Sequence, residues 1–329
     1  MAIALHGQAK RICWPCYAEQ RFNCLGIKQM RRSTLPTAAG LFDRLPRYLR
    51  RHKLMKAWMG LTGEDPVQLV RIRDDAFGYA DMSDGFLRLV VIDGHYDEEF
   101  FRVADELLSQ GGVFFDVGAN YGLLSFGLAK KFCKTVHFHL FEPNASLVKS
   151  IERTRELYHS MRSVVNEVAV SDENGFVLFD VDPSQTGRSH ITDVGGSPVK
   201  SIKLDDYITA TQLERIDFVK LDIEGYELSA LRGAERALKN RTVKAVYFEY
   251  FEKYLVRVAP PSVLIEYLES LGFEVCFCRR FDFETRGKPA LTLKKGLPGH
   301  GLPLLAVKGY RPPAMTDLLA VPKEHLAAI

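Results

Sequence analysis

Short apolar runs alternate with amphipathic stretches along most of this chain. The runs rich in β-branched and aromatic residues are 113–115, 136–141, 163–170, 216–221 and 244–249. Such runs are typical of strands that are buried on both faces of a parallel sheet. The stretches that repeat apolar residues at intervals of three or four are 121–131, 226–238 and 261–271, and this spacing predicts helices. The alternation predicts an α/β fold whose mostly parallel sheet is flanked by helices.

Smaller elements are predicted on both sides of this core. Residues 61–110 are expected to form a small β cap, with short strands at 67–73, 76–82 and 86–92, followed by a helix at 96–110. Strands are also predicted at 273–278 and 304–307, around an exposed loop at 279–303. Pro312 and Pro313 suggest that ordered structure ends there, so residues 311–329 are expected to be a loose tail. The main domain is predicted to span residues 111–310.

A glycine-rich turn, Asp116 to Gly122, joins the first buried strand to the helix after it. Open α/β sheets bind ligands at the carboxyl ends of their strands, which is where this turn lies. Gly118 and Gly122 are expected to leave room for a ligand against the backbone, and the helix amides favour an anionic group. The spacing is G-x-x-x-G rather than the G-x-G-x-x-G of dinucleotide-binding proteins, which argues against a nicotinamide cofactor.

Two further positions suit a nucleoside. Glu142 ends the second strand roughly 20 residues after the glycine turn, where Rossmann-like sheets bind ribose hydroxyls. The backbone from Asn166 to Ala169, at the tip of the third strand, either contacts an adenine ring or belongs to the sheet core. The candidate cofactor-binding residues are Asp116, Gly118, Asn120, Gly122, Glu142, Asn166 and Ala169.

Carboxylates gather at the ends of the fourth and fifth strands. Asp222, Glu224 and Glu227 follow the fourth strand in a Lys-x-Asp-x-Glu-Gly-x-Glu string, and Glu249 ends the fifth. Asp222 and Glu249 end adjacent strands, so they can share a proton or a divalent cation. Glu227 opens a helix and is interpreted as complementing the helix dipole.

The glycine turn, Glu142-Pro143-Asn144, the 166–175 stretch and the 220–227 string together resemble the FkbM-type methyltransferases, a class I family that depends on S-adenosylmethionine (SAM). The resemblance covers roughly residues 85–310, at plausible loop lengths. It implies a Rossmann-like class I fold whose seven-stranded sheet is closed by an antiparallel hairpin of strands 273–278 and 304–307. It also implies SAM as cofactor and O-methylation of a sugar, glycolipid or secondary metabolite.

The chemistry required makes some residues candidates for catalysis. Methyl transfer is an in-line displacement that brings the acceptor oxygen within roughly 3 to 3.5 Å of the methyl carbon. An alcohol must also lose its proton, to a general base or with help from a divalent cation. The family's glycine- and serine-rich loop is placed near 186–190, which adds Arg188 as a candidate acceptor clamp. The candidate catalytic residues are Asp222, Glu224, Glu249 and His190, and a metal is left open.

Two other functions are considered. A SAM-binding or interaction protein without catalysis would not need three carboxylates beside the methyl donor. An N-methyltransferase acting on protein or nucleic acid is disfavoured because the fourth strand lacks an Asn/Asp-Pro-Pro-Tyr string. The acceptor is therefore expected to be a small molecule or a glycan rather than a nucleic acid, and the oligomeric state is left open.

Composition adds limits to this picture. The 329 residues are 47% hydrophobic and carry a net charge of +3, and no apolar run reaches the roughly 18 residues of a membrane span. Residues 1–60 carry +10 and the remainder −7, so the first 60 residues are predicted to be a basic extension. Cys13, Cys16 and Cys24 there suggest zinc, but a fourth ligand at standard spacing is missing, although His6 is nearby. The cysteine usage suggests a reducing cytoplasm.

Overall fold

The computed structural model describes residues 60–61, 63, 65–85, 87, 96–278, 295–296, 303–307 and 312–328. The predicted basic extension with its cysteines, most of the predicted strand at 86–92 and most of the 279–303 loop lie outside that part of the chain. Within it, every helix is too short or too polar to cross a bilayer.

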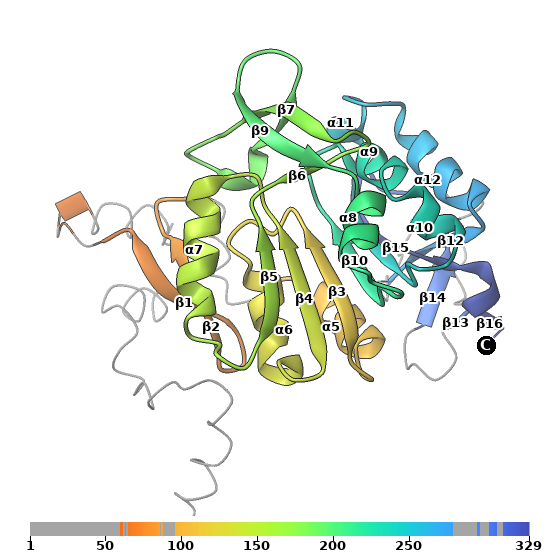
Figure 1. Cartoon of the computed structure of the whole chain (residues 1–329), viewed down its shortest axis with the longest axis horizontal. Helices are drawn as coiled ribbons and strands as arrows, with labels where there is room; N and C mark the ends of the chain where they lie inside the picture. Colours follow the sequence, from red (N-terminus) through yellow and green to blue (C-terminus); the bar gives the residue numbers. More distant parts are fainter. Residues whose placement is uncertain are drawn as a thin grey trace, which may run out of the picture.

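In the described part of the chain, ten strands form the central sheet. They are β3 (Gly112–Val117), β4 (Val136–Phe141), β5 (Arg162–Asn166), β10 (Phe218–Leu221), β11 (Val246–Phe251), β12 (Phe273–Phe277), β13 (Lys295–Gly296), β14 (Pro303–Ala306), β15 (Met315–Pro322) and β16 (Ala327–Ala328). Their order is β16-β13-β14-β12-β15-β11-β10-β3-β4-β5 (Figure 1). The strands from β5 to β11 run parallel, and β15 is antiparallel to both β11 and β12. The seven strands from β5 to β12 confirm the predicted Rossmann-like class I methyltransferase fold.

The antiparallel strand that closes this sheet comes from the segment expected to be a loose tail. Within 311–329, β15 inserts between β11 and β12, and its Leu318 and Leu319 are fully buried in the two opposite cores. The hairpin partner predicted for β12, now β14, instead lies on the outer edge of β12. The tail prediction is wrong because an apolar run at 318–321 forms a doubly buried strand after the two prolines.

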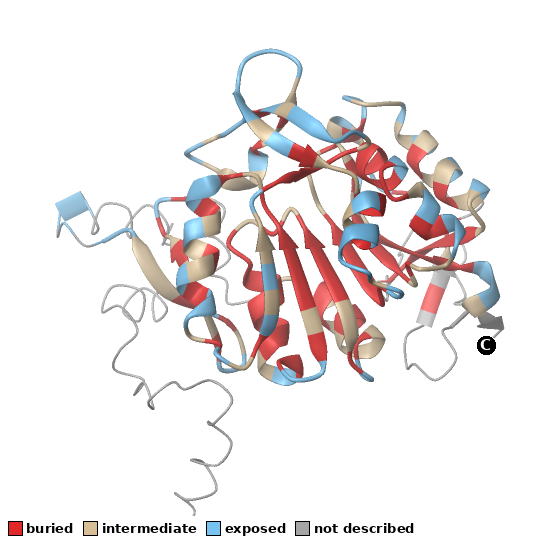
Figure 2. Ribbon diagram, viewed as in Figure 1, coloured by how far each residue is buried: buried red, intermediate tan, exposed pale blue. Residues whose placement is uncertain are grey.

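Helices cover both faces of the sheet (Figure 1). One face carries α5 (Glu98–Leu107), α6 (Leu123–Phe132) and α7 (Ala145–Arg155), and the other carries α8 (Leu204–Ala210), α9 (Glu227–Arg232), α10 (Glu235–Lys239) and α12 (Pro261–Ser270). Successive side chains of a strand point to opposite faces. Phe114 therefore joins the core under α5 and α6, while Phe115 joins the core under α8 and α10. The central strands are buried almost throughout (Figure 2).

A small antiparallel sheet, β1 (Val67–Arg73) and β2 (Ala76–Asp81), packs outside α6 and α7. The hydroxyl of Tyr158 accepts from the backbone N–H of Phe77 at 2.8 Å and donates to its carbonyl at 2.6 Å. The hydroxyl of Thr154 accepts from the N–H of Tyr79 at 2.9 Å. These bonds join β1 and β2, which match the strands predicted at 67–73 and 76–82, to α7 and the turn after it.

A second, four-stranded sheet lies at the carboxyl ends of the central strands (Figure 1). Its strands, in order, are β6 (Ala169–Val170), β9 (Ser197–Ile202), β7 (Gly175–Asp180) and β8 (His190–Thr192). The loop between β7 and β8 contains a single 3₁₀ turn, Thr186–Arg188. This sheet brings the loop back over the end of the parallel strands.

We expect Leu319→Ala to lower the free energy of unfolding by about 2 to 5 kcal/mol, because it empties a fully buried position between β11 and β12. The same substitution at Leu61, which is 86% exposed, should change that energy by less than about 0.5 kcal/mol. Urea unfolding followed by circular dichroism measures both. A loose tail would give two small and equal values.

Candidate active site

The register of the parallel strands brings the predicted site residues to one edge of the sheet. Val117, at the end of β3, pairs with Phe141 of β4 and with Leu221 of β10. Leu221 pairs in turn with Phe248 of β11. The residues one step beyond this row are Gly118, Glu142, Asp222 and Glu249. Backbone pairing alone therefore places four positions that are distant in sequence side by side.

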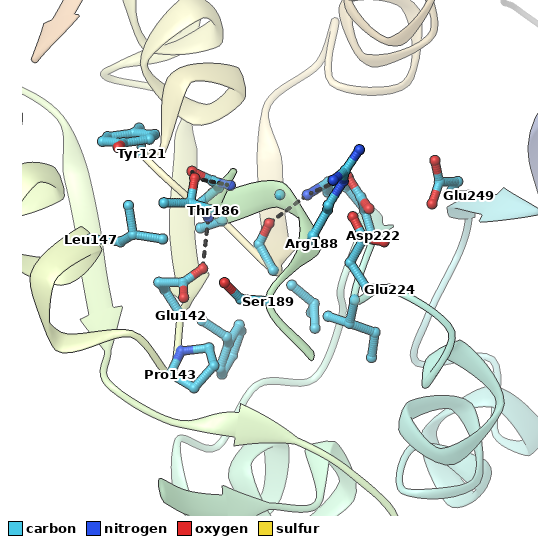
Figure 3. Close-up of a pocket in the computed structure, with 18 of the residues that line it drawn as sticks. Tyr121, Glu142, Pro143, Leu147, Thr186, Arg188, Ser189, Asp222, Glu224 and Glu249 are labelled. Carbon is cyan, nitrogen blue, oxygen red and sulfur yellow. Dashed lines mark hydrogen bonds and ion pairs between the residues drawn. The ribbon is translucent and has the colours of Figure 1, made fainter. Parts of the chain in front are cut away.

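A cavity of about 560 Å³ opens at this edge, within the size range of small-molecule sites. Seven of the predicted site residues line it: Gly118, Asn120, Glu142, Ala169, Asp222, Glu224 and Glu249. Four others do not: Asp116, Gly122, Asn166 and His190. Figure 3 shows Glu142, Pro143 and Leu147 on one side of the cavity and Asp222, Glu224 and Glu249 on the other.

Glu142 is buried at the first side of the cavity, with 4% of its surface exposed. One carboxylate oxygen accepts from the N–H of Asn120 at 2.8 Å, and the other accepts from the N–H of Asn144 at 2.9 Å. Burial raises the pKa of Glu142 to about 7, although the two amide bonds oppose this shift. Each oxygen keeps a further lone pair, so the carboxylate can still accept a bond from a hydroxyl in the cavity.

Lys220 lines the cavity and joins the two strands that carry the site. Its Nζ lies 3.5 Å from Asp116 Oδ1 and 3.5 Å from Asp222 Oδ2, and it donates to the carbonyl of Gly118 at 2.7 Å. Burial lowers the pKa of Lys220, but the two carboxylates outweigh burial and leave it raised. The other oxygen of Asp116 accepts from the hydroxyl of Ser125 at 2.7 Å. Asp116 therefore supports the glycine turn from behind the cavity.

The two glycines of the turn are required by contacts within the protein. Gly118 has φ +75°, and a Cβ there would lie 2.0 Å from the carbonyl oxygen of Asp222. Gly122 has φ +70°, and its Cβ would lie 2.9 Å from the ring of Phe126. Gly118, which also lines the cavity, lets two loops pack together, and Gly122 accommodates an aromatic ring. That both glycines leave room for a ligand stays a prediction.

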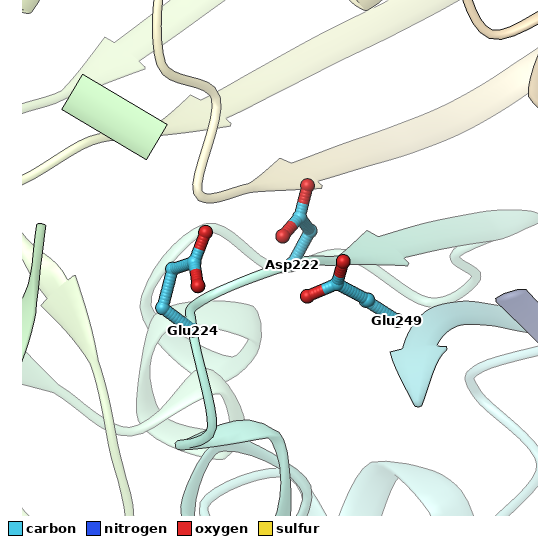
Figure 4. Close-up of side chains that lie close together, drawn as sticks. All are labelled: Asp222, Glu224 and Glu249. Atoms are coloured by element: carbon cyan, nitrogen blue, oxygen red, sulfur yellow. The ribbon is translucent and has the colours of Figure 1, made fainter. Parts of the chain in front are cut away.

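Asp222, Glu224 and Glu249 converge on the second side of the cavity (Figure 4). Each offers a carboxylate oxygen, and these oxygens lie within 4.8 Å of one another. Glu224 adopts the left-handed φ of +57°, which is strained for a non-glycine residue. The buried Glu227 holds this loop, because one of its oxygens accepts from the N–H groups of Ile223 at 3.0 Å and Gly225 at 3.2 Å. Glu227 thus binds loop amides rather than only facing a helix dipole.

The crowding of negative charge changes the protonation of the cluster. Burial first, and then the charges of Asp222 and Glu227, raise the pKa of Glu224 to about 8. Burial together with the charges of Asp222 and Glu224 raises the pKa of Glu249 to about 9. Near neutral pH Glu224 and Glu249 therefore retain protons, which a bound cation would displace. Perturbed carboxylates of this kind are concentrated at functional sites.

The loop between β7 and β8 closes the cavity from above. Thr186 donates from its N–H to Asp84 at 3.1 Å, and its hydroxyl also bonds that carboxylate. Arg188 lines the cavity, as the predicted acceptor clamp would. His190 lies outside the lining, and its Nδ1 is 2.9 Å from the carbonyl oxygen of Arg188. Asn166 is also turned away, because its side-chain amide donates to the carbonyl of Leu140 at 3.0 Å.

Comparison with known proteins identifies the domain that carries this site. Residues 116–275 match the family described as the methyltransferase FkbM domain. The chain carries an FkbM methyltransferase domain. The match includes every predicted cofactor-binding and catalytic residue.

A curated relative and two solved structures are more distantly similar to this chain. The hexuronic acid methyltransferase AglP of Haloferax volcanii is 25% identical over 149 residues, which cover 44% of this chain and 59% of that protein. The match thus spans less than two thirds of the relative's length. Among solved structures, a putative O-methyltransferase from Klebsiella pneumoniae is 11% identical with a TM-score of 0.36, covering 69% of this chain and 80% of that one. TYW2 of M. jannaschii, in complex with AdoMet, is 12% identical with a TM-score of 0.35, covering 81% and 89%. Structural likenesses this weak add nothing to what the strand order shows.

Asp317 is a carboxylate of the site that lies outside the matched FkbM region. Asp317 of β15 pairs directly with Glu249 of β11 and lines the same cavity. Sequence reasoning missed it because it fell in the expected tail. Its position just before the apolar run at 318–321 was the available signal, since the other site carboxylates also adjoin apolar runs. Tyr96 and Asp97, at the start of α5, line the cavity as well.

Gly118→Ala should destabilise the FkbM domain by about 1 to 3 kcal/mol or more, because alanine is strained at this φ and its Cβ would meet the Asp222 carbonyl. The matched control is Gly187→Ala in the loop above the cavity, where a Cβ meets nothing within 4 Å and φ is not left-handed. Thermal unfolding of both variants checks this, and equal midpoints would contradict the close contact between the two loops.

Proposed function

We propose that the FkbM domain transfers a methyl group from SAM to a hydroxyl of a sugar-like acceptor that enters beside Asp222, Glu224 and Glu249. The observation that carries the proposal is the position of this acid cluster, in the same cavity as Glu142 but on its opposite side. One side suits a nucleoside and the other suits the removal of a proton from an alcohol. Methyl transfer to an alcohol needs both together.

The side of the cavity near Glu142 fits the nucleoside part of SAM. The Glu142 carboxylate can accept both ribose hydroxyls, as acidic residues at the second strand of Rossmann-like sheets do. Pro143, Leu147, Val168 and Ala169 add an apolar lining next to it that suits an adenine ring. When bound, SAM supplies an electrophilic methyl group attached to a positively charged sulfur. The negative charge of Asp222 favours a cation at the boundary between the two sides.

The acid cluster can remove the hydroxyl proton in two ways. Asp222 carries a side chain that is 44% exposed at the cavity, and its carboxylate can accept a proton directly. Alternatively, Asp222, Glu224 and Glu249 supply the hard oxygen ligands that Mg²⁺ or Mn²⁺ prefers, and a cation there would acidify the hydroxyl. The carboxylates are better placed for either task than His190, which does not line the cavity.

The chemistry of the cavity and the relative named above support the proposed acceptor class. A hydroxyl is the acceptor that needs a base, and a base is what the cluster offers. AglP carries the name hexuronic acid methyltransferase, which supports a sugar acceptor for this FkbM domain too. A glycolipid or a hydroxylated metabolite presents the same functional group.

We expect Glu142→Ala to weaken SAM binding by about 1.5 to 3 kcal/mol, because it removes charge-assisted hydrogen bonds to the ribose. Glu152→Ala, at a half-exposed position on α7, is the matched control and should bind SAM as the unaltered chain does. Titration calorimetry measures the three affinities. The assignment of the cavity to SAM fails if the unaltered chain does not bind it, whereas equal affinities would remove only Glu142.

We expect Asp222→Asn to lower turnover by roughly 10²-fold or more, because it keeps the shape but removes the charge that accepts a proton or binds a cation. SAM affinity should change little, since the glycine turn and Glu142 remain. Asp206→Asn, on the exposed surface of α8, should leave turnover unchanged. The measurement is methyl uptake from labelled SAM by a panel of hydroxylated sugars.

Glu249→Gln distinguishes the two versions of this chemistry. With a shared cation, the Asp222 and Glu249 variants both lose turnover and both respond to added Mg²⁺ or Mn²⁺. Chelators then also inhibit the unaltered chain. With a simple base, chelators have no effect and only one of the two carboxylates is indispensable. Turnover by Asp222→Asn close to that of the unaltered chain would end the proposed role of Asp222.

A further inference from the structure

The wall of the cavity continues past the acid cluster. β11 extends three residues beyond the end of β10, since Phe248 is the last residue that pairs with β10, while β15 pairs with β11 as far as Phe251. Two cross-strand pairs follow one another along this extension: Glu249 with Asp317, and then Phe251 with Met315. Side chains two residues apart point to the same face of a strand. The apolar pair therefore continues the same wall as the acidic pair.

The apolar pair lies roughly 7 Å beyond the acidic pair, as two residues of strand require. Phe251, Met315 and the nearby Tyr254 all line the cavity. Met315 is 61% exposed, and the rings of Phe251 and Tyr254 meet edge to face with centroids 4.5 Å apart. The spacing of roughly 7 Å between the acidic pair and the apolar pair is on the scale of one sugar ring. An acceptor unit next to the reacting one would therefore reach these apolar side chains.

Cations accompany the aromatic side chains. The guanidinium of Arg257 lies 4.3 Å from the ring centroid of Tyr254 and also donates to the backbone carbonyl of Glu224. Lys253 Nζ lies 5.4 Å from the same ring centroid. Among the described residues, no carboxylate forms an ion pair with Arg257, although it is oriented on two sides. A guanidinium held in this way retains donors for a planar carboxylate.

The distribution of charge determines which way an acidic acceptor would face. Asp222 and Asp317 would repel a carboxylate placed at the reacting position. Arg257 and Lys253 would attract a carboxylate that points toward Tyr254. A sugar acid would therefore present a hydroxyl to the acid cluster and its carboxylate to Arg257.

We propose that Phe251, Tyr254 and Met315, together with Arg257, form an outer acceptor subsite that binds a sugar unit bearing a carboxylate. The proposal rests on the function proposed above and adds a class of acceptor, an acidic saccharide of at least two units. The apolar side chains contact the sugar ring, and Arg257 binds the carboxylate. The subsite would select acceptors by charge and length, separately from the chemistry at Asp222.

Direct binding tests the subsite without requiring turnover. Digalacturonic acid is titrated calorimetrically into the chain in the presence of excess S-adenosylhomocysteine. We expect the unaltered chain to bind it and Arg257→Gln to bind it at least tenfold more weakly. Met315→Ala leaves the bond between Arg257 and the Glu224 carbonyl in place, and it should also weaken binding severalfold. Arg155→Gln, on an exposed part of α7, is the matched control and should bind normally.

Two results would overturn the outer subsite: no binding of digalacturonic acid by the unaltered chain, or equal binding by all the variants. Methyl uptake by hydroxylated sugars is measured separately. If the unaltered chain methylates neutral sugars but does not bind the acid, the proposed function stands and the subsite falls. If it binds the acid through Arg257 and methylates no hydroxyl, the subsite stands as a binding site and the proposed function falls.

Discussion

The geometry of the site depends on the ion pairs and the hydrogen bond made by the buried ammonium group of Lys220. This group lies between Asp116 on β3 and Asp222 after β10, and it also binds the carbonyl of Gly118. One cation thus joins the glycine turn to the strand that carries the acid cluster. Removing one partner of a buried ion pair costs about 3 to 5 kcal/mol, because a charge is then left buried without compensation. The two sides of the cavity consequently keep a fixed relation to each other.

The fold concentrates carboxyl groups at a place where their mutual repulsion costs stability. Glu249 and Asp317 lie directly opposite each other on adjacent strands, and like charges in this arrangement destabilise a sheet. Glu224 is held with a strained backbone beside them, supported by the amide bonds of Glu227. Strain and repulsion at one site are typical of functional sites, where the rest of the fold supplies the stability. The surrounding strands are buried on both faces and supply that stability.

Much of the fold and part of the site could be predicted from local patterns. Apolar runs located the parallel strands, and because their carboxyl ends meet at one edge, Glu142, Asp222 and Glu249 were placed in one site. Local patterns failed where pairing is between segments far apart in sequence. Two prolines at 312–313 suggested an end to ordered structure, yet the following residues form a strand inside the sheet. Asp317 was not predicted as a site residue because it belongs to that strand, although it lines the same cavity as the predicted carboxylates.

The sequence by itself determined the class of fold, the family and the edge of the sheet where chemistry occurs. These follow from periodicity and from short motifs, which depend on neighbouring residues. Only the tertiary structure decided which carboxylates converge, that His190 and Asn166 turn away from the cavity, and that Gly118 serves a contact with Asp222. It also placed Met315 beside Phe251. The physical reason is that side-chain convergence depends on strand register and on loop packing, and no local pattern encodes either of them.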